Sequence, residues 1–149
     1  MAIGDICVRE VLVAERGTTA QEAAKLMRQY HVGDLVVVDA TSGRRVPVGI
    51  VTDRDIVISV VATGLDPKVF TLGDLLTREV VVGPADEGIF ETIQKMRRHG
   101  VRRMPIVDAQ GSLVGIVSVD DLIQLLAEEM TELSKLISRE QARETLSRR

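Results

Sequence analysis

Two seven-residue segments of the chain carry side chains that suit recognition of a nucleoside phosphate. Each contains glycine, two apolar residues, a Thr or Ser, two further residues and an Asp, and the two segments are Gly49–Asp55 and Gly115–Asp121. The Thr52 and Ser118 hydroxyls fall where a helix N-cap belongs, and the amides of a helix start favour an anion. Asp55 and Asp121 follow three residues later, and the two acceptor oxygens of a carboxylate match the vicinal hydroxyls of a ribose. For a single segment, a plain helix cap explains the same residues equally well.

The two segments lie at matching points of an internal repeat, which strengthens the hypothesis of a binding site. Gly4–Val13 returns as Gly73–Val82, 69 residues further along the chain, and the offset later falls to 66. The change falls between Ala40–Val48 and Ala109–Val114, two glycine-containing stretches that separate apolar runs. We interpret these stretches as hairpin loops of different length, since loops tolerate insertions.

Each repeat predicts the order strand, helix, strand, strand, helix. The expected strands are 11–13, 35–38 and 48–51 in the first repeat and 80–82, 104–107 and 113–117 in the second. The expected helices are 20–30 and 54–62, then 88–99 and 119–129, with helix starts marked by Thr18-Thr19 and by Pro84-Ala85-Asp86. The predicted domain limits are 1–62 for the first repeat, 63–72 for a linker, 73–130 for the second repeat and 131–149 for a helical tail. A unit of about sixty residues is marginal alone, so the two repeats should pack together through their sheets.

The tail continues the last predicted helix. Between Asp120 and Arg149 there is no Gly or Pro. Apolar residues recur at intervals of three or four, namely Leu122, Leu126, Met130, Leu133 and Ile137. This amphipathic pattern predicts a helix whose apolar side needs a partner surface, and we expect a homodimer contact. The arginines at its end alternate with glutamates, which favours a solvated helix face over a DNA-contacting tail.

The repeated unit resembles the cystathionine-β-synthase (CBS) domain, and the tandem pair resembles a Bateman module over most of the chain. The segment from glycine to aspartate is the most diagnostic part of that family, and it stands here twice. The resemblance implies an α/β fold of two β-α-β-β-α CBS repeats packed as a pseudo-two-fold pair, with an extended C-terminal helix. It also implies that ligands lie in clefts between the repeats, where backbone groups of the middle strand contact the adenine.

Carried over by position, the resemblance implies two clefts of different charge. The first would join Thr52, Arg54 and Asp55 to Arg102, Arg103, Met104 and Pro105. The second would join Ser118 and Asp121 to Thr18, Gly33, Asp34 and Leu35. Because Arg102-Arg103 align with Gly33-Asp34, we expect the first cleft to take the more anionic nucleotide. The second is expected to be empty or to prefer a nucleoside or an S-adenosylmethionine-like ligand, and a solvated strand start is the alternative reading of the arginine pair.

Composition excludes several other classes of protein. The 149 residues carry a net charge of -3, which argues against a general nucleic-acid coat, and an aromatic content of 2% excludes a single-strand binder built on stacked rings. Cys7 is the single cysteine and sits among apolar residues, so we expect it to pack in the core. With His31 and His99 as the only histidines, no zinc site of several Cys or His ligands is expected within one chain. No signal peptide or membrane-spanning run is visible, so a cytoplasmic protein is expected.

These observations predict a regulatory sensor rather than an enzyme. It would bind AMP, ADP, ATP, NAD or S-adenosylmethionine as a regulatory ligand, with no catalytic cofactor, and signal to a separate protein partner as a homodimer. One alternative is a purely structural dimerisation module without a ligand. A less favoured alternative is a nucleotide-acting enzyme, for which Asp53 and Asp120 beside the motif are the only hints, since no catalytic motif is present.

Overall fold

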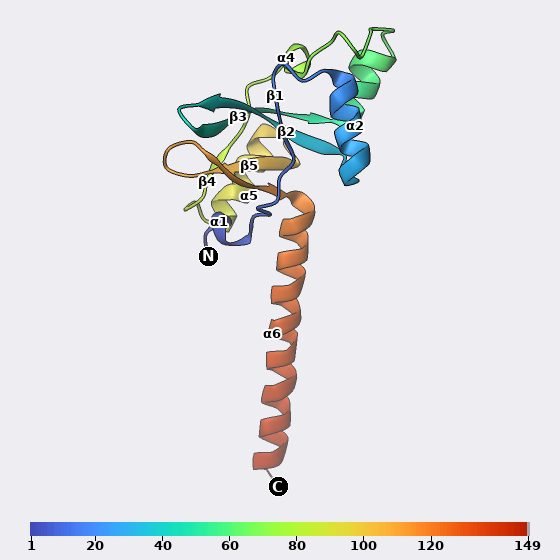
Figure 1. Cartoon of the computed structure of the whole chain (residues 1–149). Coiled ribbons are helices and arrows are strands. Elements are labelled where there is room, and N and C mark those ends of the chain that lie inside the picture. Colours follow the sequence, from blue (N-terminus) through green and yellow to red (C-terminus); the bar gives the residue numbers. More distant parts are fainter. Residues whose placement is uncertain (149) are drawn as a thin grey trace. The chain divides into compact units, whose positions relative to one another are not determined.

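The structure, a computed structural model, describes residues 1–148 of the chain. The chain divides into two compact units, Met1–Val117 and Ser118–Arg149. The first unit contains both predicted sheets and all the short helices, and the second is one long helix (Figure 1).

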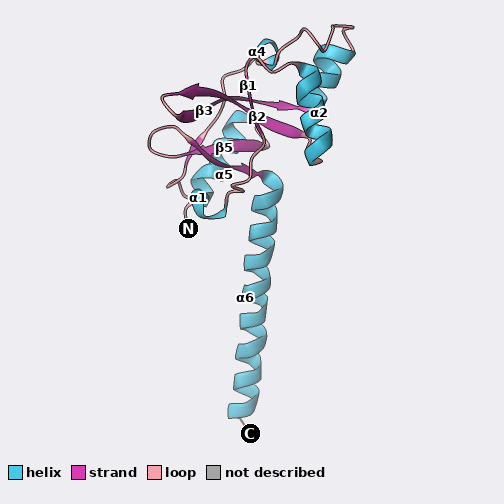
Figure 2. Ribbon diagram, viewed as in Figure 1, coloured by secondary structure: helices cyan, strands magenta, loops and turns pink. Residues whose placement is uncertain are grey.

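The first unit is built on two three-stranded sheets, with strand orders β1-β2-β3 and β4-β5-β6 (Figure 2). The strands of the first sheet are Val13–Glu15, Asp34–Thr41 and Arg44–Thr52, and those of the second are Gly83–Pro84, Arg103–Val107 and Leu113–Ser118. In each sheet the first strand runs parallel to the second, and β2 pairs antiparallel with β3. The two sheets therefore repeat the same topology, as the sequence predicts.

The helices of this unit are α1 (Ile3–Ile6), α2 (Ala20–Tyr30), α3 (Asp53–Ile56), a π-helical segment η1 (Val57–Val61), α4 (Leu72–Leu75) and α5 (Ile89–His99). The predicted helix 20–30 is confirmed: Thr19 caps its start, and His31 ends it in the left-handed conformation with φ 53°. The single helix predicted at 54–62 is instead a short α-helix that continues as η1. The helix predicted at 88–99 is α5, which begins one residue later than expected, with Gly88 as its N-cap.

The first strand of each repeat is displaced from its predicted position. β1 shares only Val13 with the predicted 11–13, and β4 lies beyond the predicted 80–82 altogether. Pro84, expected to mark a helix start, belongs to β4. The predictions were wrong here because apolar β-branched residues also suit an extended wall of a cavity, and Val80 and Val81 occupy such a wall.

The predicted hairpins form, but the loop assigned to 40–48 is mostly strand. β2 and β3 extend to Thr41 and Arg44, and only two residues connect them. Ser42 and Gly43 have φ values of 51° and 77°, the left-handed pair that a tight hairpin turn requires. In the second repeat the corresponding connection is held by Asp108, whose carboxylate accepts hydrogen bonds from the backbone of Gln110 and Ser112.

The two repeats exchange their leading segments. Ile3 N–H donates to the Glu87 carbonyl at 2.8 Å, and Leu72 N–H donates to the Thr18 carbonyl at the same distance. Gly4 and Gly73 make the next pair of equivalent bonds, at 2.9 and 3.0 Å to their respective acceptors. Every donor and acceptor is displaced by the repeat offset of 69 residues, so the repeats form a pseudo-two-fold pair in which each leading segment contacts the other repeat.

The hydrophobic core of the first repeat incorporates this exchange. Its buried residues come from all the main elements of the repeat: Ala14, Ala23, Met27, Leu35, Val37, Val51 and Ile56. Leu72, at the head of the second repeat, is fully buried in the same cluster, and Leu75 and Leu76 pack against it. Because a lone repeat would leave these contacts unmade, the two repeats stabilise each other.

The second unit is α6, an unbroken helix from Val119 to Ser147 with Ser118 as its N-cap (Figure 2). The predicted extended C-terminal helix is confirmed, and it runs without interruption past residue 130, where the second repeat is predicted to end. Most of its apolar side chains are exposed, among them Met130 at 71% and Leu133 at 60%. Within residues 1–148, no helix combines the length and the apolar character that crossing a membrane requires.

Candidate functional site

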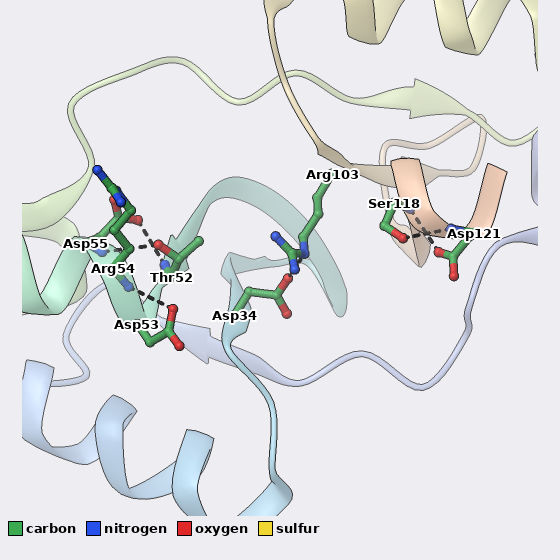
Figure 3. A network of polar contacts seen from close by, with 8 residues as sticks. All are labelled: Asp34, Thr52, Asp53, Arg54, Asp55, Arg103, Ser118 and Asp121. Carbon is green, nitrogen blue, oxygen red and sulfur yellow. Dashed lines mark hydrogen bonds and ion pairs between the residues drawn. The ribbon is translucent and has the colours of Figure 1, made fainter. Parts of the chain in front are cut away.

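Thr52 and Asp55 form a reciprocal pair of hydrogen bonds at the junction of β3 and α3 (Figure 3). The Asp55 N–H donates to Thr52 Oγ1 at 3.1 Å, and the Thr52 N–H donates to Asp55 Oδ2 at 2.9 Å. Thr52 is extended, with φ -108° and ψ 163°, so its side chain lies over the first turn of the helix. This capping box satisfies two backbone donors that the helix start leaves open.

The same box occurs at other helix starts, so it does not by itself mark a binding site. Ser118 and Asp121 form it at the start of α6, with distances of 3.1 and 2.9 Å. Thr19 with Glu22 and Thr71 with Asp74 form it at α2 and α4, outside the diagnostic segments. A functional role therefore requires a further property that distinguishes one box from the rest.

Asp55 has that property, because it lines a cavity of about 380 Å³ in the first unit. The cavity is bounded by Gly49 and Ile50 on β3, and by the segment Leu75–Val81, which is irregular after Leu75 at the end of α4. Val101, just before β5, and Arg103, on β5, complete the lining. Its volume falls in the range of small-molecule pockets. Both repeats contribute walls to this cavity.

Several residues predicted for the first cleft do not line this cavity, although Thr52 is hydrogen-bonded to Asp55. Thr52, Arg54 and Arg102 are not among the residues that line the cavity. Met104 and Pro105 are fully buried on β5, so their side chains fill the interior instead of facing the cavity. The predicted residues that the structure brings together at the cavity are Asp55 and Arg103.

Arg103 and Asp34, which the sequence assigned to opposite clefts, form an ion pair through Arg103 Nε and Asp34 Oδ2 (Figure 3). Asp34 is also the residue of β2 directly opposite Thr52 of β3. The positive charge expected from Arg102-Arg103 is therefore reduced, because Asp34 offsets the charge of Arg103 beside the cavity. The cavity lining has two acidic side chains, Asp55 and Glu79, and two basic ones, Arg78 and Arg103.

Three other residues predicted for the second cleft make their contacts within the first unit. The Gly33 carbonyl accepts a hydrogen bond from the Asp53 N–H at 2.9 Å, and the Thr18 carbonyl accepts from the Leu72 N–H at 2.8 Å. Leu35 is buried in the core of the first repeat. Ser118 and Asp121 belong to the second unit, where they cap α6.

The segment Leu75–Val81 is the part of the site that sequence reasoning missed. A second cavity of about 400 Å³ is lined by Glu10, Val11, Leu12, Tyr30 and Val32. All but Tyr30 have counterparts 69 residues later in the lining of the first cavity. The repeat offset could have identified both sets, since the predicted strands 11–13 and 80–82 overlap them.

The glycine of each diagnostic segment permits a close approach by the exchanged leading segment. A Cβ at Gly49 would overlap the Leu76 side chain, and one at Gly115 would lie 2.7 Å from Cys7 Sγ. Leu76 and Cys7 are equivalent residues at the repeat offset. The predicted core position of Cys7 is confirmed, and burial raises the pKa of its thiol although the nearby Arg9 charge acts in the opposite direction.

No group of three or more His, Cys, Asp or Glu side chains within residues 1–148 is arranged to hold a metal ion. No catalytic constellation was predicted, and Asp53, one of the two hints of enzymatic chemistry, accepts a hydrogen bond from the Arg54 N–H at 2.8 Å. This contact gives Asp53 a local role at the start of α3.

Comparison with known proteins identifies the family. The CBS domain model matches residues 3–62 and 72–128, and this chain belongs to the CBS domain family as a tandem pair. It is 34% identical over 125 residues to an uncharacterized protein of Methanopyrus kandleri, with 84% of this chain and 62% of that protein covered. The match thus spans less than two thirds of that relative.

Two solved structures are similar over most of the chain. Hypoxic Response Protein I, a structure with two coordinated zinc ions, has a TM-score of 0.71 and 34% identity, covering 83% of this chain and 98% of that one. The CBS domain pair of protein MJ0100, in complex with 5′-methylthioadenosine and S-adenosyl-L-methionine, has a TM-score of 0.69 and 25% identity. That match covers 87% of this chain and 98% of the other.

Proposed function

We propose that the CBS pair binds an adenosyl compound in the cavity beside Asp55 and signals its occupancy to a separate protein. The observation that carries this proposal is that Asp55, the capping-box carboxylate of the first diagnostic segment, lines a cavity built from both repeats. The MJ0100 pair, which shares the fold, binds two adenosyl compounds.

The chemistry of the cavity suits the nucleoside part of such a ligand. Asp55 Oδ2 accepts the Thr52 N–H, which leaves Oδ1 to accept a ribose hydroxyl. Apolar side chains, including Ile50, Val80, Val81 and Val101, provide surfaces for an adenine ring. Arg78 and Arg103 are the cationic groups available to a phosphate.

The balance of charge favours adenosyl ligands without a polyphosphate. The acidic and basic residues of the lining are equal in number, and Arg103 is engaged by Asp34. A triphosphate would have to draw Arg103 from Asp34 and approach Asp55 and Glu79. We therefore propose adenosine, 5′-methylthioadenosine, S-adenosylmethionine or AMP as the preferred class, in place of the more anionic nucleotides expected from sequence.

The test is ligand binding by calorimetry and thermal shift with a panel of adenosine, 5′-methylthioadenosine, S-adenosylmethionine, AMP, ADP, ATP, NAD and GMP. A ligand that binds only the folded state raises the melting temperature by mass action. Asp55→Ala should abolish the shift. Asp74→Ala removes an equivalent capping-box carboxylate at α4, one that does not itself line the cavity, and should retain it.

The proposal fails if no compound binds at millimolar concentration, because a structural pairing module would then explain the fold. It also fails if Asp55→Ala and Asp74→Ala reduce binding equally, because loss of a helix cap would then account for both. Signalling is tested separately, by recovering partner proteins from extracts with and without the identified ligand and comparing the wild type with Asp55→Ala.

A further inference from the structure

The surface of α6 combines an apolar stripe with a separation of charge along the helix. The stripe consists of Ile123, Leu126, Met130, Leu133 and Ile137, spaced alternately by three and four residues. These side chains are between 40% and 71% exposed. A stripe with this spacing is the pattern by which two helices pack side by side.

The charges of α6 differ between its two halves. Residues 119–132 contain five acidic side chains and no basic one: Asp120, Asp121, Glu128, Glu129 and Glu132. Residues 133–148 contain four basic side chains, Lys135, Arg139, Arg143 and Arg148, against Glu140 and Glu144. The first half therefore has a net charge of -5 and the second of +2. This distribution matches the helix dipole, but it also makes α6 complementary to a reversed copy of itself.

We propose that two copies of this chain pair through α6 in antiparallel orientation. Reversal places the acidic half of each helix beside the basic half of the other, whereas a parallel pair would place the two acidic halves together. With the two-fold axis between Met130 and Leu133, these residues lie opposite each other, and Leu126 of one copy lies opposite Ile137 of the other. Four apolar layers are then buried at the centre, and the pairing is independent of any ligand.

Orientation is measured by electron-spin distance between labelled copies of the full chain. Thr131→Cys and Thr145→Cys are matched label sites, because each threonine hydroxyl donates to the carbonyl four residues earlier, at 2.9 Å. With a helix rise of about 1.5 Å per residue, an antiparallel pair separates the two 145 positions by about 40 Å along the axis. The two 131 positions lie on either side of the two-fold axis, within about 20 Å of each other including the labels. The control is the parent chain without an introduced cysteine, whose buried Cys7 should take up little label.

A short distance at 131 with a long distance at 145 supports the proposal. Short distances at both sites mean a parallel pair, and the absence of a short distance at 131 means that α6 does not pair; either result overturns it.

Two further variants test the stripe and the charge separately. Leu133→Asp should abolish the short distance at 131, while Leu146→Asp, an equally exposed residue off the stripe, should preserve it. Replacing Glu128, Glu129 and Glu132 by Lys makes both halves basic and should weaken pairing at least tenfold. Replacing Glu140 and Glu144 by Lys leaves opposite charges facing each other and should not weaken it. Equal effects within either pair of variants would contradict the proposal.

Discussion

Because Arg103 is paired with Asp34, a single substitution at Asp34 should change how strongly the cavity binds a phosphate-bearing ligand. Asp34→Asn keeps the shape of the side chain but removes the charge that engages Arg103. The freed guanidinium can then bind a phosphate, and one negative charge beside the cavity is lost. We therefore expect Asp34→Asn to raise the affinity for AMP while leaving the affinity for adenosine unchanged.

The size of the effect follows from the exposure of the pair. The Arg103 and Asp34 side chains are 41% and 22% exposed, so the solvent screens their attraction. Pairs of this kind contribute about 0.2–1 kcal/mol, and 1 kcal/mol corresponds to about a fivefold change in a binding constant. The expected gain in AMP affinity is therefore up to about fivefold. The affinity for S-adenosylmethionine, which carries a sulfonium charge, should fall.

The assay is isothermal titration of the wild type and the variant with adenosine and AMP at two salt concentrations. The matched control is Asp39→Asn, which breaks the ion pair of Arg16 with Asp39 at 2.9 Å; neither residue belongs to the lining of this cavity. The gain for AMP should shrink as salt rises, because salt screens a partly exposed charge. An equal change for adenosine and AMP, or the same gain in the control, would refute the assignment of Arg103 to the phosphate.

Four further predictions concern packing within the first unit. Gly49→Ala should destabilise the fold by about 1–3 kcal/mol through overlap with Leu76, measured by urea unfolding, whereas Gly17→Ala, with open space around its Cβ, should not. Cys7 should react slowly with alkylating agents in the folded protein, because burial raises the pKa of its thiol. Since the unfolded thiol ionises first, stability should decline as the pH rises above about 8.5, and a Cys7→Ala variant should lose that decline. Thr92→Val should cost about 1 kcal/mol, measured by thermal melting, because Thr92 is fully buried and its hydroxyl lies within hydrogen-bond distance of the Gly88 carbonyl and the Glu87 carboxylate.

The repeat made much of the fold predictable. Helix α2 was placed correctly because Thr19 supplies a cap and the apolar residues of the helix recur on one face. The paired strands β2–β3 and β5–β6 were found from apolar runs, although Ser42-Gly43 was not recognised as a two-residue turn. The first strands were misplaced because a β-branched run has the same local preference in a strand and in an irregular cavity wall.

The candidate site was predictable only in part. The diagnostic segments pointed to Asp55, and alignment of the repeats pointed to Arg103, both of which line the cavity. The pairing of Arg103 with Asp34 was not predictable, because it joins residues far apart in the chain across two sheets. The same holds for Leu76, which reaches Gly49 through the exchange of leading segments.

The tandem architecture, the helix caps and the long last helix follow from the order of the residues alone. These depend on local hydrogen bonds and on the period of apolar residues, which a single strand or helix already contains. Which capping box borders a cavity, and which charges meet there, depends instead on how the repeats pack together. Those properties arise from the exchange of segments between the repeats, and an ion pair or a cavity depends on distances that no local pattern encodes.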